Sequence, residues 1–101
     1  MKSFILLLTI PLTFSFSQSK EICIENLSIF AESAKVKNYD EAYKPWSDVK
    51  DECPDLNLAI YTYGERILKS KIKNAQPEDI DSFKNQLIDL YDQWLVHFPS
   101  K

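Results

Sequence analysis

The sequence has little glycine: Gly64 is the only one among 101 residues. It also has no hairpin-type dipeptide such as Asn-Gly, and no run in which apolar and polar residues alternate. Strands joined by tight turns depend on these signals, so their absence argues against a β-sheet. The same scarcity of glycine excludes a glycine-rich phosphate-binding loop. We therefore predict an all-α protein.

Histidine and cysteine are almost as scarce, which limits the chemistry that the chain can perform. His97 is the only histidine, and Cys23 and Cys53 are the only cysteines. Transition-metal sites use several such side chains at ligand spacing, and that pattern is absent. His97 lies near the end of a helical pattern, where a cation is favourable for structural reasons. We predict no catalytic residue, no metal, no cofactor and no enzymatic activity.

The chain has no strongly basic segment. Lysine and arginine number 12 against 15 aspartates and glutamates, which gives a net charge of −3 at pH 7. Proteins that bind nucleic acid usually concentrate basic side chains on one face, where they contact phosphates. Nucleic acid is therefore not an expected partner, and the expected partner is a protein or peptide of unknown identity.

The first 17 residues are typical of an export signal. Lys2 supplies a positive start, residues 4–16 form an uncharged, mostly apolar run, and Ser15-Phe16-Ser17 is a small-x-small cleavage pattern. The run is shorter than the roughly 20 residues that span a bilayer. We predict a cleaved signal peptide over 1–17, an exported protein of the periplasm or cell envelope, and no stable membrane insertion afterwards. An uncleaved N-terminal anchor is the alternative.

The predicted mature chain shows the three- and four-residue spacing of apolar positions that indicates amphipathic helices. We expect helices over about 22–36, 40–52, 56–72 and 77–97. Gly64 lies inside the third, where glycine costs about 1 kcal/mol relative to alanine and usually lets another helix pack close. In the fourth helix the residues expected to face inward include Leu90, Tyr91 and Leu95.

The two cysteines are expected to form a disulfide. Cys23 begins the first predicted helix and Cys53 ends the second, so an antiparallel helix pair brings them together. Export would place both in an oxidising compartment. A loop of this length gives a stabilisation of about 3–4 kcal/mol in the chain-entropy model. The alternative is a pair of buried free thiols.

The two predicted helix pairs share a spacing. Trp46 precedes Pro54 by eight residues, just as Tyr91 precedes Pro99. The segment 38–42, Asn-Tyr-Asp-Glu-Ala, with Trp46 and Pro54 after it, resembles the second half of a tetratricopeptide repeat. Tyr63-Gly64, with Ile67 after it, resembles the pattern of that family's first helix.

The resemblance covers nearly all of the mature chain, 18–101, in units of about 23–54 and 56–99. It implies a short α-solenoid of two stacked antiparallel helix pairs. With its signal peptide, two cysteines and segment 60–66, the chain is similar to the N-terminal part of exported tetratricopeptide-repeat proteins of Bacteroidota bacteria.

The sequence departs from the family pattern at several positions. Phe30 stands where the family prefers a small residue, Ser33 where it prefers an aromatic one, and Leu87 where it prefers alanine. Residues 70–79 are an insertion that we expect to lengthen the connection between the third and fourth helices. These departures bear on the regularity of the superhelix more than on the helix pairs.

In tetratricopeptide proteins the first helix of each pair lines a groove that binds a peptide or a partner helix. Carried over by position, the resemblance implies a binding groove formed by Leu27, Ala31, Lys35, Tyr61, Glu65 and Lys69. A plainer interpretation makes Leu27 and Ala31 part of the core, and Glu65 and Lys69 an exposed i,i+4 pair.

The function expected from the sequence is a non-enzymatic scaffold for protein–protein interaction. The alternative is a small secreted, disulfide-stapled helical bundle with hydrolase or inhibitor activity, in which a pocket contains His97. Helical repeats need neighbours to cover their apolar faces. We therefore expect Trp94, Leu95 and Phe98 to be covered by self-association or by further C-terminal repeats.

Overall fold

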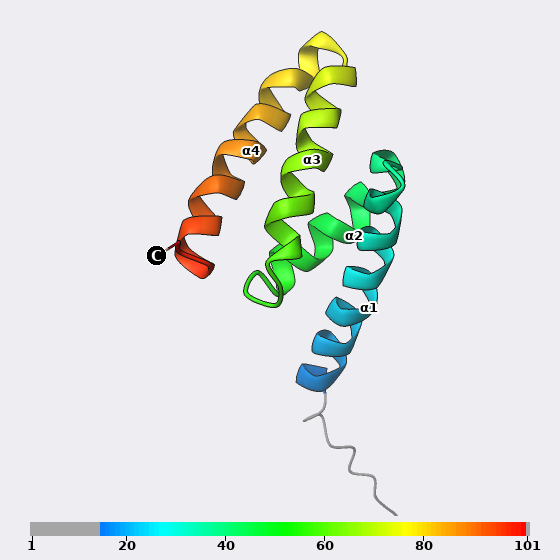
Figure 1. Cartoon of the computed structure of the whole chain (residues 1–101), viewed down its shortest axis with the longest axis vertical. Coiled ribbons are helices and arrows are strands. Elements are labelled where there is room, and N and C mark those ends of the chain that lie inside the picture. Colours follow the sequence, from blue (N-terminus) through cyan, green and yellow to red (C-terminus); the bar gives the residue numbers. More distant parts are fainter. Residues whose placement is uncertain (1–14, 101) are drawn as a thin grey trace, which may run out of the picture.

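The protein consists of four α-helices, as a computed structural model of residues 15–100 shows, with side chains described from residue 19 (Figure 1). The helices are α1 (Ser15–Lys35), α2 (Tyr39–Glu52), α3 (Ala59–Asn74) and α4 (Pro77–His97). The described range contains no strand, so the all-α prediction is confirmed. Most of the predicted signal peptide, 1–14, lies outside the described residues.

The helices form two antiparallel pairs, α1 with α2 and α3 with α4. The pairs meet because α3 packs against both α1 and α2. Helix α4 lies at one edge of the arrangement and α1 at the opposite edge (Figure 1). Side chains also join α2 to α4, since the Tyr43 hydroxyl donates to Gln86 Oε1 at 2.9 Å. The result is a repeat-like stack of helix pairs.

The turn between α1 and α2 is a Schellman motif. Asn38 N–H donates to the carbonyl of Ser33 at 2.8 Å, and Lys37 N–H donates to that of Ala34 at 2.9 Å. This closure requires a left-handed residue, and Lys37 supplies it with φ of 64°. Three residues, 36–38, therefore separate α1 from α2.

Two predicted helix bounds were wrong. Helix α1 begins at Ser15, seven residues before the predicted start, so the Ser15–Ser17 cleavage pattern lies in its first turn. Helix α3 begins at Ala59, whose N–H donates to the side chain of Asn57 at 2.8 Å. This Asx turn satisfies a free N–H at the start of α3, next to Leu58 at the N-cap.

The predicted long connection after the third helix was also wrong. Helix α3 continues to Asn74, and only Ala75 and Gln76 separate it from α4. The segment 70–79 therefore lengthens the two helices rather than the loop. Its lysines favour this outcome because lysine is a good helix former.

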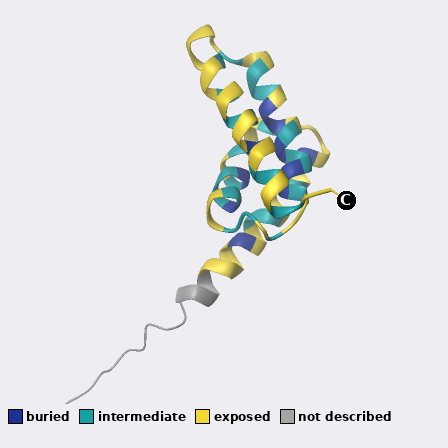
Figure 2. Cartoon of the chain, turned by 90° about the vertical axis from the view of Figure 1, so that its left-hand side faces the viewer, coloured by how far each residue is buried: buried dark blue, intermediate teal, exposed yellow. Residues whose placement is uncertain are grey.

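The core lies where the helices meet (Figure 2). At its centre Trp46 of α2 is fully buried against α3, and its indole Nε1 donates to the carbonyl of Ile60 at 2.7 Å. A Cβ on Gly64 would lie 2.5 Å from the same Nε1. The prediction that this glycine permits a close helix contact is thus confirmed. The other fully buried large side chains are Phe30, Val49, Ile60, Tyr61, Ile67, Leu68 and Leu90.

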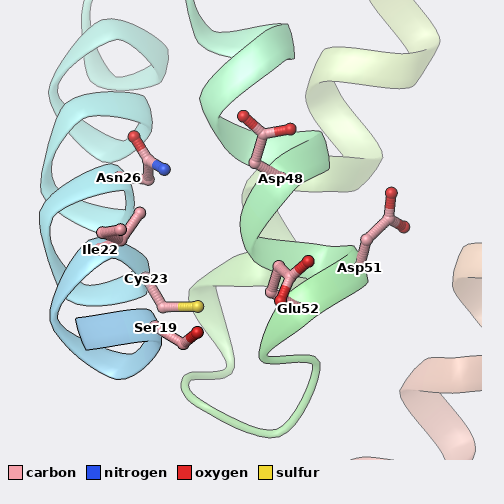
Figure 3. A pocket seen from close by; sticks show the side chains of 7 residues that line it. All are labelled: Ser19, Ile22, Cys23, Asn26, Asp48, Asp51 and Glu52. Atoms are coloured by element: carbon pink, nitrogen blue, oxygen red, sulfur yellow. The ribbon is translucent and has the colours of Figure 1, made fainter. Parts of the chain in front are cut away.

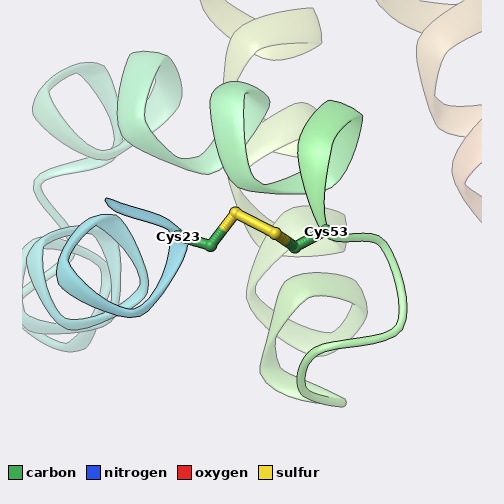
Figure 4. The surroundings of a disulfide bond; sticks show 2 residues. All are labelled: Cys23 and Cys53. Carbon is green, nitrogen blue, oxygen red and sulfur yellow. A yellow bond between two sulfur atoms is a disulfide. The ribbon is translucent and has the colours of Figure 1, made fainter. Parts of the chain in front are cut away.

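The predicted disulfide is present. Cys23 of α1 and Cys53, at the end of α2, are bonded with a Cα–Cα distance of 6.4 Å (Figure 4). This distance lies within the range that disulfides span. The bond closes a 30-residue separation and ties the end of α2 to α1 at Cys23, more than two turns inside that helix.

Candidate binding surface

The three predicted groove residues of α1 lie in different environments. Leu27 and Ala31 are half-buried and pack against the core. Lys35 is exposed, and its ammonium lies 3.8 Å from the carboxylate of Glu32, one turn earlier. The plainer interpretation therefore holds for Leu27 and Ala31, which support the core.

Tyr61 does not contribute to an accessible groove, because it is fully buried. Its hydroxyl donates to the carbonyl of Pro54 at 2.8 Å. Rings of Trp94, His97 and Phe98, all at the end of α4, lie within 6.4 Å of the Tyr61 ring, centroid to centroid. Burial, and then the nearby carboxylates of Asp55 and Asp89, raise the pKa of Tyr61.

Glu65 and Lys69 form the i,i+4 pair that the plainer interpretation predicts, with 3.5 Å between ammonium and carboxylate. A third residue joins them, since the Tyr91 hydroxyl of α4 donates to Glu65 Oε2 at 2.6 Å. This bond is the main cause that lowers the pKa of Glu65, and it raises the pKa of Tyr91. This role of Tyr91 was not predicted from the sequence.

The six predicted residues therefore do not gather into one groove. Helix α3 turns the side that carries Tyr61 and Glu65 toward α4, and the Phe30 ring of α1 meets Tyr63 instead, at 6.5 Å. Positions carried over from a family pattern fix a face of a helix, but they do not fix which neighbour covers that face.

The outer side of α4 carries a row of exposed apolar side chains, which we call the α4 face. Its members and their exposed fractions are Ile88 59%, Tyr91 37% and Leu95 65%. Ile88 and Leu95 are seven residues apart, so they share one side of the helix. The prediction that Leu95 points inward was wrong, and the prediction for Leu90, which is fully buried, is confirmed. Tyr91 is intermediate, because it is 37% exposed but its hydroxyl reaches Glu65 of α3.

A depression of about 380 Å³ adjoins the α4 face near the end of the helix. Its lining consists of Tyr91, Trp94, Leu95, Phe98 and Ser100. Three of these residues, Trp94, Leu95 and Phe98, are those for which the sequence predicted a covering partner. The lining of the depression is mostly apolar.

A second depression lies between α1 and α2 beside the disulfide, also of about 380 Å³ (Figure 3). It is lined by Ser19, Ile22, Cys23, Asn26, Asp48, Asp51 and Glu52. Asp48 is already paired with Lys44 at 3.0 Å. Within residues 15–100 no group of three or more potential ligands is placed to hold a metal ion.

The geometry around His97 offers no nucleophile. Both cysteines are bonded to each other, so neither can form a thiolate–imidazole pair. The His97 ring lies stacked on Tyr61 at 6.4 Å with 24° between the ring planes. Its observed contacts are those of a side chain that closes one end of the core.

Comparison of the chain with protein-family models, with curated proteins and with solved structures gave no match. Among the helices of residues 15–100, none has the length and apolar character needed to cross a membrane.

Proposed function

We propose that the protein is a non-enzymatic scaffold that binds another protein through the α4 face. The observation that carries the proposal is the exposure of Ile88, Tyr91 and Leu95 side by side on one helix. Folded monomers rarely leave a contiguous apolar patch in water unless it serves an interaction. Aromatic and large aliphatic side chains are also those that contribute most to protein interfaces.

The proposed function includes export of the protein and an architecture of two tetratricopeptide-like units. The disulfide supports an exported protein of the periplasm or cell envelope, because such bonds persist in oxidising surroundings. The shared spacing of Trp46–Pro54 and Tyr91–Pro99, together with the stacked helix pairs, supports two tetratricopeptide-like units. The alternative of a hydrolase or inhibitor has less support, because His97 is stacked on Tyr61.

Site-specific photo-crosslinking in cells that make the protein tests this proposal. A photoreactive residue is placed at Leu95 on the α4 face, or at Val36 as a control. Val36 is also apolar and is 74% exposed, but it lies in the turn after α1. We expect Leu95 to yield an adduct with a different protein, identified by mass spectrometry, and Val36 to yield none. No adduct from Leu95, or one only with a second copy, would contradict the proposal.

A further inference from the structure

The contact between α2 and α3 shows how one helix of this chain covers the apolar side of another. In the contact between α2 and α3, Trp46 fills the space that Gly64 leaves open, and its indole bonds to the backbone of Ile60. Farther along, Lys71 of α3 lies 2.9 Å from Asp40 of α2. Residues nearer the start of α2 therefore lie beside residues nearer the end of α3, so the two helices are antiparallel.

Helix α4 repeats the relevant spacing of α2 but has no helix in the corresponding place. Tyr91 stands eight residues before Pro99, as Trp46 stands before Pro54. Yet Trp46 is fully buried whereas Tyr91 is 37% exposed. Because α4 lies at the edge of the described helices, the exposed side chains of Ile88 and Leu95 face away from the other three (Figure 1), and only Tyr91 at the border reaches α3, through its hydroxyl bond to Glu65. Because Trp46 is covered by α3 and Tyr91 is partly exposed, we infer that a helix similar to α3 could cover Tyr91.

The charges of the helices indicate which kind of helix can bind to the α4 face. Helix α2 has five carboxylates against two lysines, and α3, which covers it, has four basic residues against one glutamate. Helix α4 has five carboxylates against one lysine, and three of those carboxylates, Glu78, Asp79 and Asp81, lie at its start. The internal contact therefore joins an acidic helix to a basic one, and α4 is a second acidic helix.

Resting on the proposed function, we propose that the α4 face binds a basic amphipathic α-helix of another protein. This helix runs antiparallel to α4 and places glycine or alanine over Tyr91. Its lysines or arginines, in the last turns, lie on the side of Glu78 and Asp81, at the start of α4. Opposite charges at such an interface guide the partner and fix its direction.

The same charges disfavour two other occupants. In a contact between two copies of α4, two helices with an excess of carboxylates would meet, and like charges across an interface weaken it. An anionic membrane surface would meet the same repulsion. The acidic character of α4 thus favours a basic helix over both.

A peptide of residues 57–76 of this chain is the probe, since it carries the α3 sequence with its capping asparagine. The labelled peptide is titrated with the intact protein, and fluorescence anisotropy reports binding. We expect saturable binding that weakens as salt rises, because surface charges are screened. The double variant Ile88→Ser/Leu95→Ser should bind at least about tenfold more weakly, since it removes apolar contact without changing charge. Val36→Ser, the matched control, should bind as the parent does.

Changes in the peptide test the chemistry of the occupant. Replacing its Gly64 by leucine keeps the charge but fills the space meant for Tyr91, so affinity should fall at least about tenfold. Replacing its four basic residues by glutamate should abolish binding. Equal affinity for either changed peptide would overturn the inference. So would binding that survives Ile88→Ser/Leu95→Ser, because the peptide would then be exchanging with α3 on α2.

The outcomes also separate this inference from the proposed function. A foreign protein crosslinked at Leu95, together with no binding of the peptide, would overturn the inference alone. Failure of both experiments would remove the proposed function as well. Self-association in sedimentation that Ile88→Ser/Leu95→Ser abolishes would identify a second copy as the occupant and overturn the inference.

Discussion

At the scale of single residues, the contact between Gly64 and Trp46 sets the distance between α2 and α3. The indole cannot move away, because it is fully buried and bonded to the carbonyl of Ile60 at 2.7 Å. The role of Gly64 could be predicted from the sequence, since glycine inside a helix costs stability unless something packs against it. The identity of its neighbour could not, because it depends on how the two pairs stack.

Gly64→Ala should therefore lower the free energy of unfolding by about 2–3 kcal/mol, the usual cost of overpacking a tight core. The new Cβ would lie 2.5 Å from Trp46 Nε1. Urea denaturation followed by circular dichroism measures the change. Thr62→Ala on the same helix is the control, with an expected change below about 0.7 kcal/mol. A neutral Gly64→Ala would show that the close contact does not exist.

The bond between Tyr91 and Glu65 gives a second residue-scale prediction. It lowers the pKa of Glu65, so its contribution to stability is present above the usual pKa of glutamate and is lost as pH falls through the lowered value. The same bond raises the pKa of Tyr91, so the contribution of Tyr91 to stability is present below the usual pKa of tyrosine and is lost as pH rises through the raised value. In Tyr91→Phe the pKa of Glu65 should rise toward its ordinary value, measured by NMR titration of the carboxyl carbon. An unchanged pKa would mean that another group lowers it.

At the scale of elements, the α1–α2 hairpin is fixed at both ends, by the Schellman turn and by the disulfide. The disulfide could be predicted from the sequence because antiparallel packing of the first two predicted helices brings Cys23 and Cys53 together, although α1 in fact begins eight residues before Cys23. The bounds of α3 could not. Its polar end, 69–74, looks like a loop by hydropathy, but lysines are compatible with a helix whose outer side faces water.

Replacing both Cys23 and Cys53 by alanine should lower the free energy of unfolding by about 3–4 kcal/mol, because the unfolded chain loses the closure of a 30-residue separation. Thermal and urea unfolding measure the effect. Treatment of the parent protein with a reductant should give a similar loss. If the double variant were as stable as the parent, the disulfide would have no role in holding the hairpin.

Lys37 is a position at which a substitution should stabilise the same hairpin. Its φ of 64° is strained for lysine and free for glycine. Lys37→Gly should raise the free energy of unfolding by up to about 1 kcal/mol, whereas Lys37→Ala, which keeps the strain, should leave it nearly unchanged. Equal effects of the two variants would contradict the left-handed turn.

At the scale of the whole molecule, the stack of two helix pairs leaves the outer side of α4 open. The sequence indicated that Leu95 needs cover but assigned it to the core, because a helix with apolar residues on most sides does not show which side faces its own chain. Only the packing separates Leu90, fully buried, from Leu95, which is 65% exposed. The predicted groove failed for the same reason, since α4 covers Tyr61.

Substitution of these two leucines by alanine should therefore change the free energy of unfolding by very different amounts. Leu90→Ala should lower the free energy of unfolding by about 2–5 kcal/mol, because it leaves a cavity in the core. Leu95→Ala should change it by less than about 0.5 kcal/mol, as is usual for surface positions. Denaturation of the two variants side by side makes the comparison, and a large loss for Leu95→Ala would show that the side chain is buried.

The claim at the centre of this account is that the α4 face binds another protein, and photo-crosslinking from Leu95 tests it most directly. We expect a specific adduct with a different polypeptide from Leu95, none from the equally apolar Val36, and loss of the Leu95 adduct when Ile88 is also changed to serine. The absence of any adduct from Leu95, or adducts of equal yield from both positions, would contradict it.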